Sequence, residues 1–242
     1  MELIVCKDAA AASKKAGELV LGTVKENPHA VLGLATGSTP EGMYKFLIKD
    51  HQENGTTYAG VKTYNLDEYV GLDGTHEQSY RYFMNQHLFN LIDIDKNNTH
   101  VPNGTGDVEA NAKIYDTMLD ELGGADLQIL GIGSNGHIAF NEPGVPFECT
   151  THVVDLVPET IEANARFFDS LDEVPKRAVS MGIASILKAK KIVLVALGES
   201  KAAAVKAMFE DEITTAVPAT ALRNHPNVTV IVDEEAGALL NK

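Results

Sequence analysis

Cysteine, basic residues and long apolar runs are all scarce in this chain of 242 residues. Cys6 and Cys149 are too few for a disulfide framework, which indicates a reducing, cytoplasmic location. With 20 Lys and Arg against 34 Asp and Glu, the net charge is −14, which argues against nucleic acid or an anionic membrane as the main partner. No apolar run approaches the roughly 18 residues of a membrane span, and the N-terminus does not resemble a secretory leader.

The residues that are present describe a globular protein. Apolar residues make up 44% and charged residues 22% of the chain, and there is no internal repeat, linker or sharp change of composition. We therefore expect a single domain over residues 1–242, long enough to bury a substantial core.

Short apolar runs alternate with amphipathic segments along the chain. The predicted strands are 3–6, 30–35, 61–66, 127–132, 178–182, 192–197 and 228–233, and the predicted helices are 8–26, 40–53, 77–91, 107–122 and 200–210. Several of the strands are rich in Val, Ile and Leu without alternation, as in a sheet that is covered on both faces. The pattern predicts an α/β fold with a mostly parallel, doubly wound sheet.

Four polar turns follow predicted strands: "ATGSTPEG", "NLDEYVGL", "GSNGHIAFNEPG" and "GESKAAAV". In a parallel sheet, ligands bind beyond the carboxyl ends of the strands. We therefore expect these four turns to lie on one rim and to form a common site.

Two of these turns suit an anion such as phosphate. Thr36, Gly37, Ser38 and Thr39 lead into a helix whose N-terminus would face the ligand, although an ordinary strand-to-helix turn is the alternative. The turn is not a P-loop, because no Gly-Lys-Ser/Thr follows. Lys201 stands near a helix start, against the helix dipole, where it either meets an anion or is simply solvated.

Three charged residues have two interpretations each. Asp67 and Glu68 follow a predicted buried strand, and a carboxylate at this place either acts as a base or caps a turn. Adjacent residues in an extended chain point to opposite sides, so only one of the two is expected to face the site. Arg166, in "NARFF", is suited to clamping a phosphate or lies on a helix surface.

Gly131, Gly133 and Gly136 have the G-x-G-x-x-G spacing of a dinucleotide-binding turn. That function requires a helix after the third glycine, and "HIAFNEPGVPF" contains two prolines that prevent a long one. Asp155 lies at the distance of a ribose-binding acid, but no predicted strand ends there. A dinucleotide site is therefore disfavoured.

The same loop carries Asn135, His137 and Glu142, which suit a catalytic loop. Histidine is the usual general acid or base near neutral pH, and a carboxylate can hold its tautomer and stabilise its charged form. The alternative is a histidine that satisfies backbone groups. No second His or Cys follows at ligand spacing, so a zinc site is not expected.

The motifs "LGLATGSTPEG", "NLDEYVGL", "GIGSNGHIAFNEPG", "NARFF" and "LGESKA" resemble the glucosamine-6-phosphate deaminase family in order and spacing, over residues 30–232. The resemblance implies a Rossmann-like three-layer αβα sandwich with a mobile lid. It also implies conversion of glucosamine 6-phosphate to fructose 6-phosphate and ammonia, in amino sugar catabolism, without a metal or an organic cofactor.

The resemblance also implies a role for each matched residue. Asp67 matches the base that moves the C2 proton to C1. His137 matches the residue that assists ring opening, and Glu142 matches the carboxylate that orients it. Arg166 and Lys201 match phosphate ligands, together with the turn 36–39. A lid over roughly 151–181 would bring Arg166 to the phosphate and shield the reaction from water.

The chain departs from the family pattern at two places. Many members have Asp where this chain has Asn135, which cannot ionise, so the imidazolium of His137 should be less favoured. The allosteric members bind N-acetylglucosamine 6-phosphate through a segment of hydroxyl and basic residues. Here that segment has other residues, namely Val145, Pro146, His152, Val154 and Asp155. The chain is also shorter than those hexamers, so we expect a monomer without this activation.

Two alternatives remain. A related sugar-phosphate hydrolase of the 6-phosphogluconolactonase kind shares the scaffold and a Gly-His loop, although "AFNEPG" and "NLDEY" favour the deaminase. A non-catalytic phosphosugar-binding protein would keep the pocket without turnover, which the intact Asp67, His137 and Glu142 argue against.

Overall fold

A parallel sheet of seven strands forms the centre of the computed structural model, which describes residues 1–165 and 168–241. Every pairing within this sheet is parallel, which confirms the predicted fold class. The strand order across the sheet is β1 (Glu2–Cys6), β10 (Val228–Asp233), β9 (Ile192–Ala196), β6 (Leu127–Leu130), β2 (Val31–Leu34), β3 (Lys62–Asn65) and β5 (Thr99–His100).

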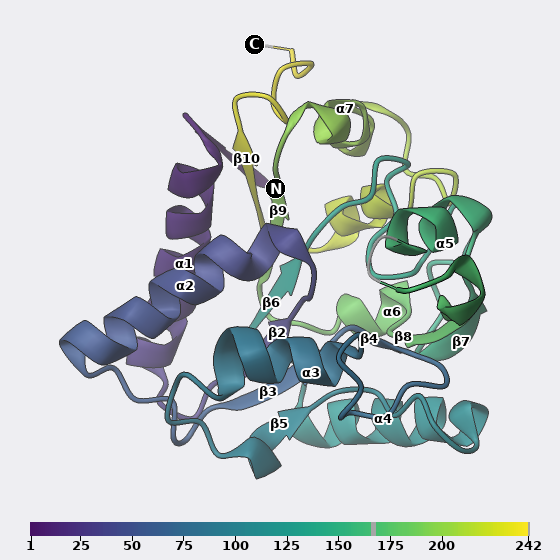
Figure 1. Cartoon of the computed structure of the whole chain (residues 1–242). Coiled ribbons are helices and arrows are strands. Elements are labelled where there is room, and N and C mark those ends of the chain that lie inside the picture. Colours follow the sequence, from purple (N-terminus) through teal and green to yellow (C-terminus); the bar gives the residue numbers. More distant parts are fainter. Residues whose placement is uncertain (166–167, 242) are drawn as a thin grey trace.

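Helices flank the sheet, with α1 and α2 together on one side and α6 and α7 on the other (Figure 1). In α1, Ala12, Ala16, Val20 and Val24 are buried at a spacing of four, so one stripe of the helix faces the core. No described helix is long and apolar enough to cross a membrane. The α-helices are α1 (Ala9–Glu26), α2 (Ser38–Asn54), α3 (Tyr80–Met84), α4 (Val108–Leu122), α5 (Pro158–Asn164), α6 (Ile183–Ile186) and α7 (Ala202–Glu210).

Several segments between the α-helices and strands form π- or 3₁₀-helices. The helix predicted over 77–91 is divided: α3 starts after Ser79, whose hydroxyl accepts a hydrogen bond from the Tyr82 N–H, and Asn85–Phe89 continues as a π-helix. Short 3₁₀ segments span Lys96–Asn98, Leu171–Glu173, Glu199–Lys201 and Pro218–Asn224.

A second, antiparallel sheet of three strands lies beside the first and was not predicted. Its order is β4 (Asp67–Tyr69), β8 (Arg177–Ser180) and β7 (His152–Asp155). The strand predicted at 178–182 thus belongs here and not to the parallel sheet. Because β4 pairs with β8, Asp67 lies opposite Ser180, and both ends of the segment 151–181 are held in one sheet with Asp67.

Candidate active site

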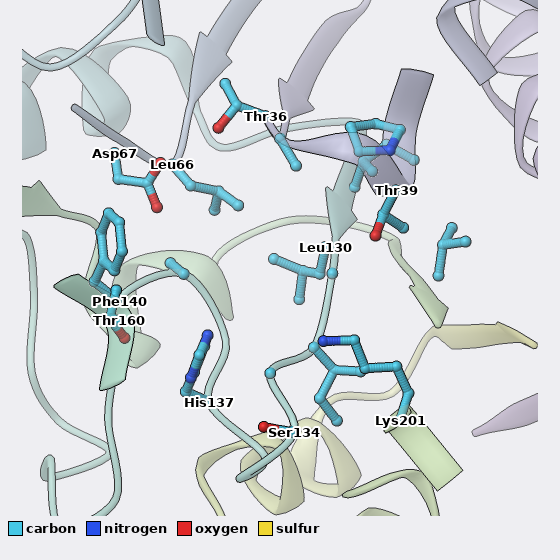
Figure 2. Close-up of a pocket in the computed structure, with 18 of the residues that line it drawn as sticks. Thr36, Thr39, Leu66, Asp67, Leu130, Ser134, His137, Phe140, Thr160 and Lys201 are labelled. Atoms are coloured by element: carbon cyan, nitrogen blue, oxygen red, sulfur yellow. The ribbon is translucent and has the colours of Figure 1, made fainter. Parts of the chain in front are cut away.

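A cavity of about 810 Å³ opens beyond the carboxyl ends of β2, β3, β6 and β9. All four polar turns contribute to it, through Thr36, Asp67, His137 and Lys201 among others, which confirms that they share one rim (Figure 2). Among the described residues, no group of three His, Cys, Asp or Glu side chains is placed to hold a metal ion.

The two carboxylates of "NLDEY" have different environments. Asp67 is 8% exposed and lines the cavity, whereas Glu68 is 3% exposed and does not. Glu68 accepts hydrogen bonds from the backbone N–H groups of Tyr69 (2.9 Å), Tyr80 (2.9 Å) and Arg81 (3.0 Å), so it fastens the start of α3 to β4. The expectation that only one of the pair faces the site is confirmed.

Burial governs the protonation of both groups. Desolvation, with the charge of Glu68 as a second cause, raises the pKa of Asp67 to about 8. Desolvation also raises the pKa of Glu68 to about 7, against the lowering effect of its backbone donors and of Arg81. The cavity therefore contains a carboxyl whose pKa lies near neutral pH, where a general base is effective.

The glycines of the 131–136 loop make room for side chains. A Cβ on Gly133 would lie 2.2 Å from Cε1 of His137, so only glycine lets the imidazole lie against the loop. Gly136 has a φ of +83°, and its Cβ would meet Val217, whereas a Cβ on Gly131 would meet nothing within 4 Å. Residues 137–157, which directly follow Gly136, contain no helix, so the loop is not a dinucleotide turn.

Contrary to expectation, a strand does end at Asp155. It is β7, which is antiparallel to its neighbour and lies outside the central sheet. It therefore does not provide the second strand of a dinucleotide-binding unit.

Glu142 is held by its neighbours on the loop. Its Oε1 lies 3.4 Å from Nδ1 of His137, which is within ion-pair distance but is not aligned for a hydrogen bond. Its Oε2 accepts a hydrogen bond of 2.8 Å from Nδ2 of Asn135, and Oδ1 of Asn135 accepts one of 3.1 Å from the His137 N–H. The amide of Asn135 thus connects both partners.

Burial alone would raise the pKa of Glu142. The neighbouring His137 outweighs this effect, with help from Asn135 and Thr160, so the pKa of Glu142 lies below its usual value. The carboxylate is consequently ionised at neutral pH, as a group that stabilises an imidazolium must be.

The opposite part of the cavity suits an anion. Thr36 and Thr39 line it, while Ser38 lines a smaller neighbouring groove and Gly37, at a φ of +89°, begins α2 without a side-chain cap. Lys201 also lines the cavity and reaches into it (Figure 2). Burial lowers its pKa, and no carboxylate in the described part of the chain lies within 4.0 Å of its ammonium. Arg166 lies outside the described residues.

Tyr80 and Thr160 are among the residues that line the cavity and that sequence reasoning did not single out. Tyr80 packs 4.7 Å from Tyr69 and lies parallel to Phe140 at 6.3 Å, measured between ring centroids. Nothing in the residue types marks either one. The place of Tyr80 at the start of a helix after "NLDEY" is the one signal that could have suggested it.

The model of the glucosamine-6-phosphate isomerase and 6-phosphogluconolactonase family matches residues 7–231. The chain belongs to this family. A glucosamine-6-phosphate deaminase of Geobacillus sp. (strain WCH70) is 53% identical over 241 residues, which cover 99% of this chain and 96% of that protein. A glucosamine-6-phosphate deaminase of Clostridium perfringens (strain 13 / Type A) is 55% identical, with 99% and 100% covered.

Solved structures share the fold. A monomeric glucosamine-6-phosphate deaminase superposes with a TM-score of 0.97 at 46% identity, and 99% of this chain and 100% of that chain are covered. The 6-phosphogluconolactonase of Trypanosoma cruzi has a TM-score of 0.81 at 22% identity, with 100% and 97% covered, which shows a common fold and no more.

Proposed function

We propose that this chain is a glucosamine-6-phosphate deaminase, which converts glucosamine 6-phosphate and water to fructose 6-phosphate and ammonia in amino sugar catabolism. The observation that carries the proposal is one cavity with three kinds of group. These are a buried carboxyl at Asp67, the His137–Glu142 pair, and an anion-binding end at Thr36, Thr39 and Lys201. Full-length relatives of that name, at 53–55% identity, support it.

The chemistry begins with ring opening. His137 moves a proton from the O1 hydroxyl to O5, so that the C1–O5 bond breaks and C1 becomes an aldehyde. Glu142 orients the imidazole and stabilises its charged form. The amide of Asn135 donates to the Glu142 carboxylate and accepts a hydrogen bond from the backbone N–H of His137.

Asp67 then acts as the base of the isomerisation. It removes the C2 proton, which the neighbouring aldehyde makes acidic, and the electrons move onto O1, which takes a proton from the ammonium group at C2 to give an enolamine. Return of the proton to C1 leaves an imine at C2, which water hydrolyses to the ketone with release of ammonia. Proximity within the cavity supplies much of the acceleration.

The phosphate positions the sugar. Thr36, Gly37, Ser38 and Thr39 at the start of α2, with Lys201, are proposed as its ligands, and Arg166 as a further one. This remote binding energy orients the reacting carbons. We regard residues 1–242 as one domain with a lid over roughly 151–181, and the reaction as independent of a metal or organic cofactor.

The proposal also covers the oligomeric state and the location of the protein in the cell. We propose a monomeric, cytoplasmic enzyme, supported by a low cysteine content and by a similar solved deaminase that is monomeric.

One assay tests the proposal. Purified protein is incubated with glucosamine 6-phosphate, and ammonia and fructose 6-phosphate are measured together; equal yields of the two are expected. Asp67→Asn should lower kcat by about 10²–10⁴-fold, the range for loss of a general base. A parallel incubation with 6-phosphogluconolactone separates the lactonase alternative, since hydrolysis of the lactone without ammonia release would replace the proposed reaction. Binding of the sugar phosphate without turnover would indicate the non-catalytic alternative.

A further inference from the structure

Thr160 is the one described side chain of α5 that contacts the catalytic loop through a polar atom. Its hydroxyl donates to Oε1 of Glu142 across 3.5 Å. This is the same carboxylate oxygen that faces Nδ1 of His137 at 3.4 Å. A residue of the 151–181 segment therefore contacts Glu142 of this pair, and Thr160 and His137 lie on the same side of the cavity (Figure 2).

The carboxylate of Glu142 is held from two directions. Asn135, on the loop, holds Oε2, and Thr160, on a helix that follows the loop in sequence, approaches Oε1. Of the described neighbours, His137 has the largest lowering effect on the pKa of this carboxylate. Without Thr160, Oε1 would have no hydroxyl or amide donor, and the carboxylate could rotate about its bond while Asn135 still held the other oxygen.

We propose that Thr160 is a positioning residue for ring opening, whose hydroxyl orients Glu142 and through it His137. The assignment rests on the proposed deaminase function. The alignment of His137 and Glu142 then depends on the position of α5, because the hydroxyl of Thr160 comes from that helix. All three side chains line the same cavity. A sugar phosphate bound in this cavity would thus contact a histidine that is already aligned for proton transfer.

The matched variants are Thr160→Val and Thr160→Ser. Valine keeps the branched shape and loses the hydroxyl, whereas serine keeps the hydroxyl and loses a methyl group. We expect kcat of Thr160→Val to fall about five- to tenfold with KM within a factor of two, because a hydrogen bond to a charged group is lost at a step after binding. Thr160→Ser should retain more than half of the wild-type kcat.

Other outcomes overturn the assignment. A raised KM with unchanged kcat would make Thr160 a substrate ligand, and equal losses in both variants would mean that the methyl group matters and the hydroxyl does not. Thermal unfolding of all three proteins identifies a fold defect. If Thr160→Val unfolds early, the comparison of Thr160→Ser with the wild type still decides, since a kcat below half of the wild-type value for serine contradicts a hydroxyl role. Absence of ammonia release by the wild type would instead refute the proposed function.

Discussion

At the scale of single residues, the protonation of Asp67 controls when the proposed base can act. Burial and the charge of Glu68 raise the pKa of Asp67 to about 8, and only the deprotonated carboxylate accepts the C2 proton. The value of kcat/KM should therefore rise tenfold per pH unit below this pKa and level off above it. A profile of kcat/KM between pH 5.5 and 9.5 measures this directly, because it reports groups of the free enzyme.

The control for this profile is Glu68→Gln. It removes the like charge beside Asp67 without entering the cavity, so the rising limb should move to lower pH. A limb that stays in place would show that burial alone sets the pKa of Asp67. A wild-type profile without a rising limb between pH 5.5 and 9.5 would contradict the argument altogether.

The amide at position 135 offers a second test. In Asn135→Asp a carboxylate would replace a donor that now lies 2.8 Å from Glu142 Oε2. The added carboxylate changes the charge beside the His137–Glu142 pair, so the pH–rate profile of Asn135→Asp should differ from that of the wild type. Asn135→Ala, which removes the amide without adding charge, should lower kcat without that change of profile. Identical limbs in wild type and Asn135→Asp would refute the charge argument.

Residue types predicted part of this site and could not predict the rest. His137 and Glu142 could be found because the chemistry of a histidine and a carboxylate on one short loop is distinctive. Strand alternation predicted that only one of Asp67 and Glu68 faces the site, and the resemblance to the family indicated Asp67. Thr160 could not be found in this way, since a threonine in a helix has many uses. The role that we propose for Thr160 depends on its contact with Glu142, which only the folded structure shows.

At the scale of elements, the proposed catalytic loop has room for the ring of His137 because Gly133 has no Cβ. In Gly133→Ala the new Cβ would lie 2.2–2.6 Å from three atoms of the His137 ring, so the imidazole must leave its place. We expect kcat to fall at least about tenfold, since a displaced general acid loses most of its 10²–10⁴-fold contribution. Gly131→Ala is the matched control on the same loop, because its Cβ would meet nothing within 4 Å. Equal activities of the two variants would mean that the ring of His137 does not need this space.

Elements formed from local signals were predictable, and those formed by distant pairing were not. The buried runs of β9 and β10 and the capped start of α1 indicate strands and a helix on their own. In the three-stranded sheet only β8 was predicted as a strand. The strand β4 is three residues long, and it forms because Asp67–Tyr69 pairs with Ala178–Ser180 far along the chain. Short strands of this kind are stable only within the assembled sheet.

At the scale of the whole molecule, a net charge of −14 surrounds a site that is to bind a phosphate. The overall field repels an anion, so binding has to come from local groups. The N-terminus of α2, with its Gly37 start and no side-chain cap, and the cavity-facing Lys201 supply them. The association rate of the sugar phosphate should therefore rise as salt is added at low ionic strength, because salt first screens the long-range repulsion between the acidic protein and the phosphate.

The proposed monomer is testable by mass and by kinetics. Sedimentation equilibrium should give 26.0 kDa at all protein concentrations, since like-charged copies repel and a monomeric deaminase has nearly the same fold. Initial rates should be hyperbolic in glucosamine 6-phosphate, and N-acetylglucosamine 6-phosphate should not activate the enzyme. Sigmoidal kinetics relieved by the acetylated sugar would contradict this prediction.

The edge strand β1 is the element that could pair with a second copy of the chain and so contradict the proposed monomer. It pairs with β10 on one side only, and it leaves Leu3 39% and Val5 55% exposed. Exposed apolar edges invite pairing with a second copy, and a lysine on such an edge opposes it. Val5→Lys should therefore leave the sedimentation mass at that of the wild type. A wild-type mass twice that of Val5→Lys would instead identify β1 as a dimer interface, with the two central sheets joined edge to edge.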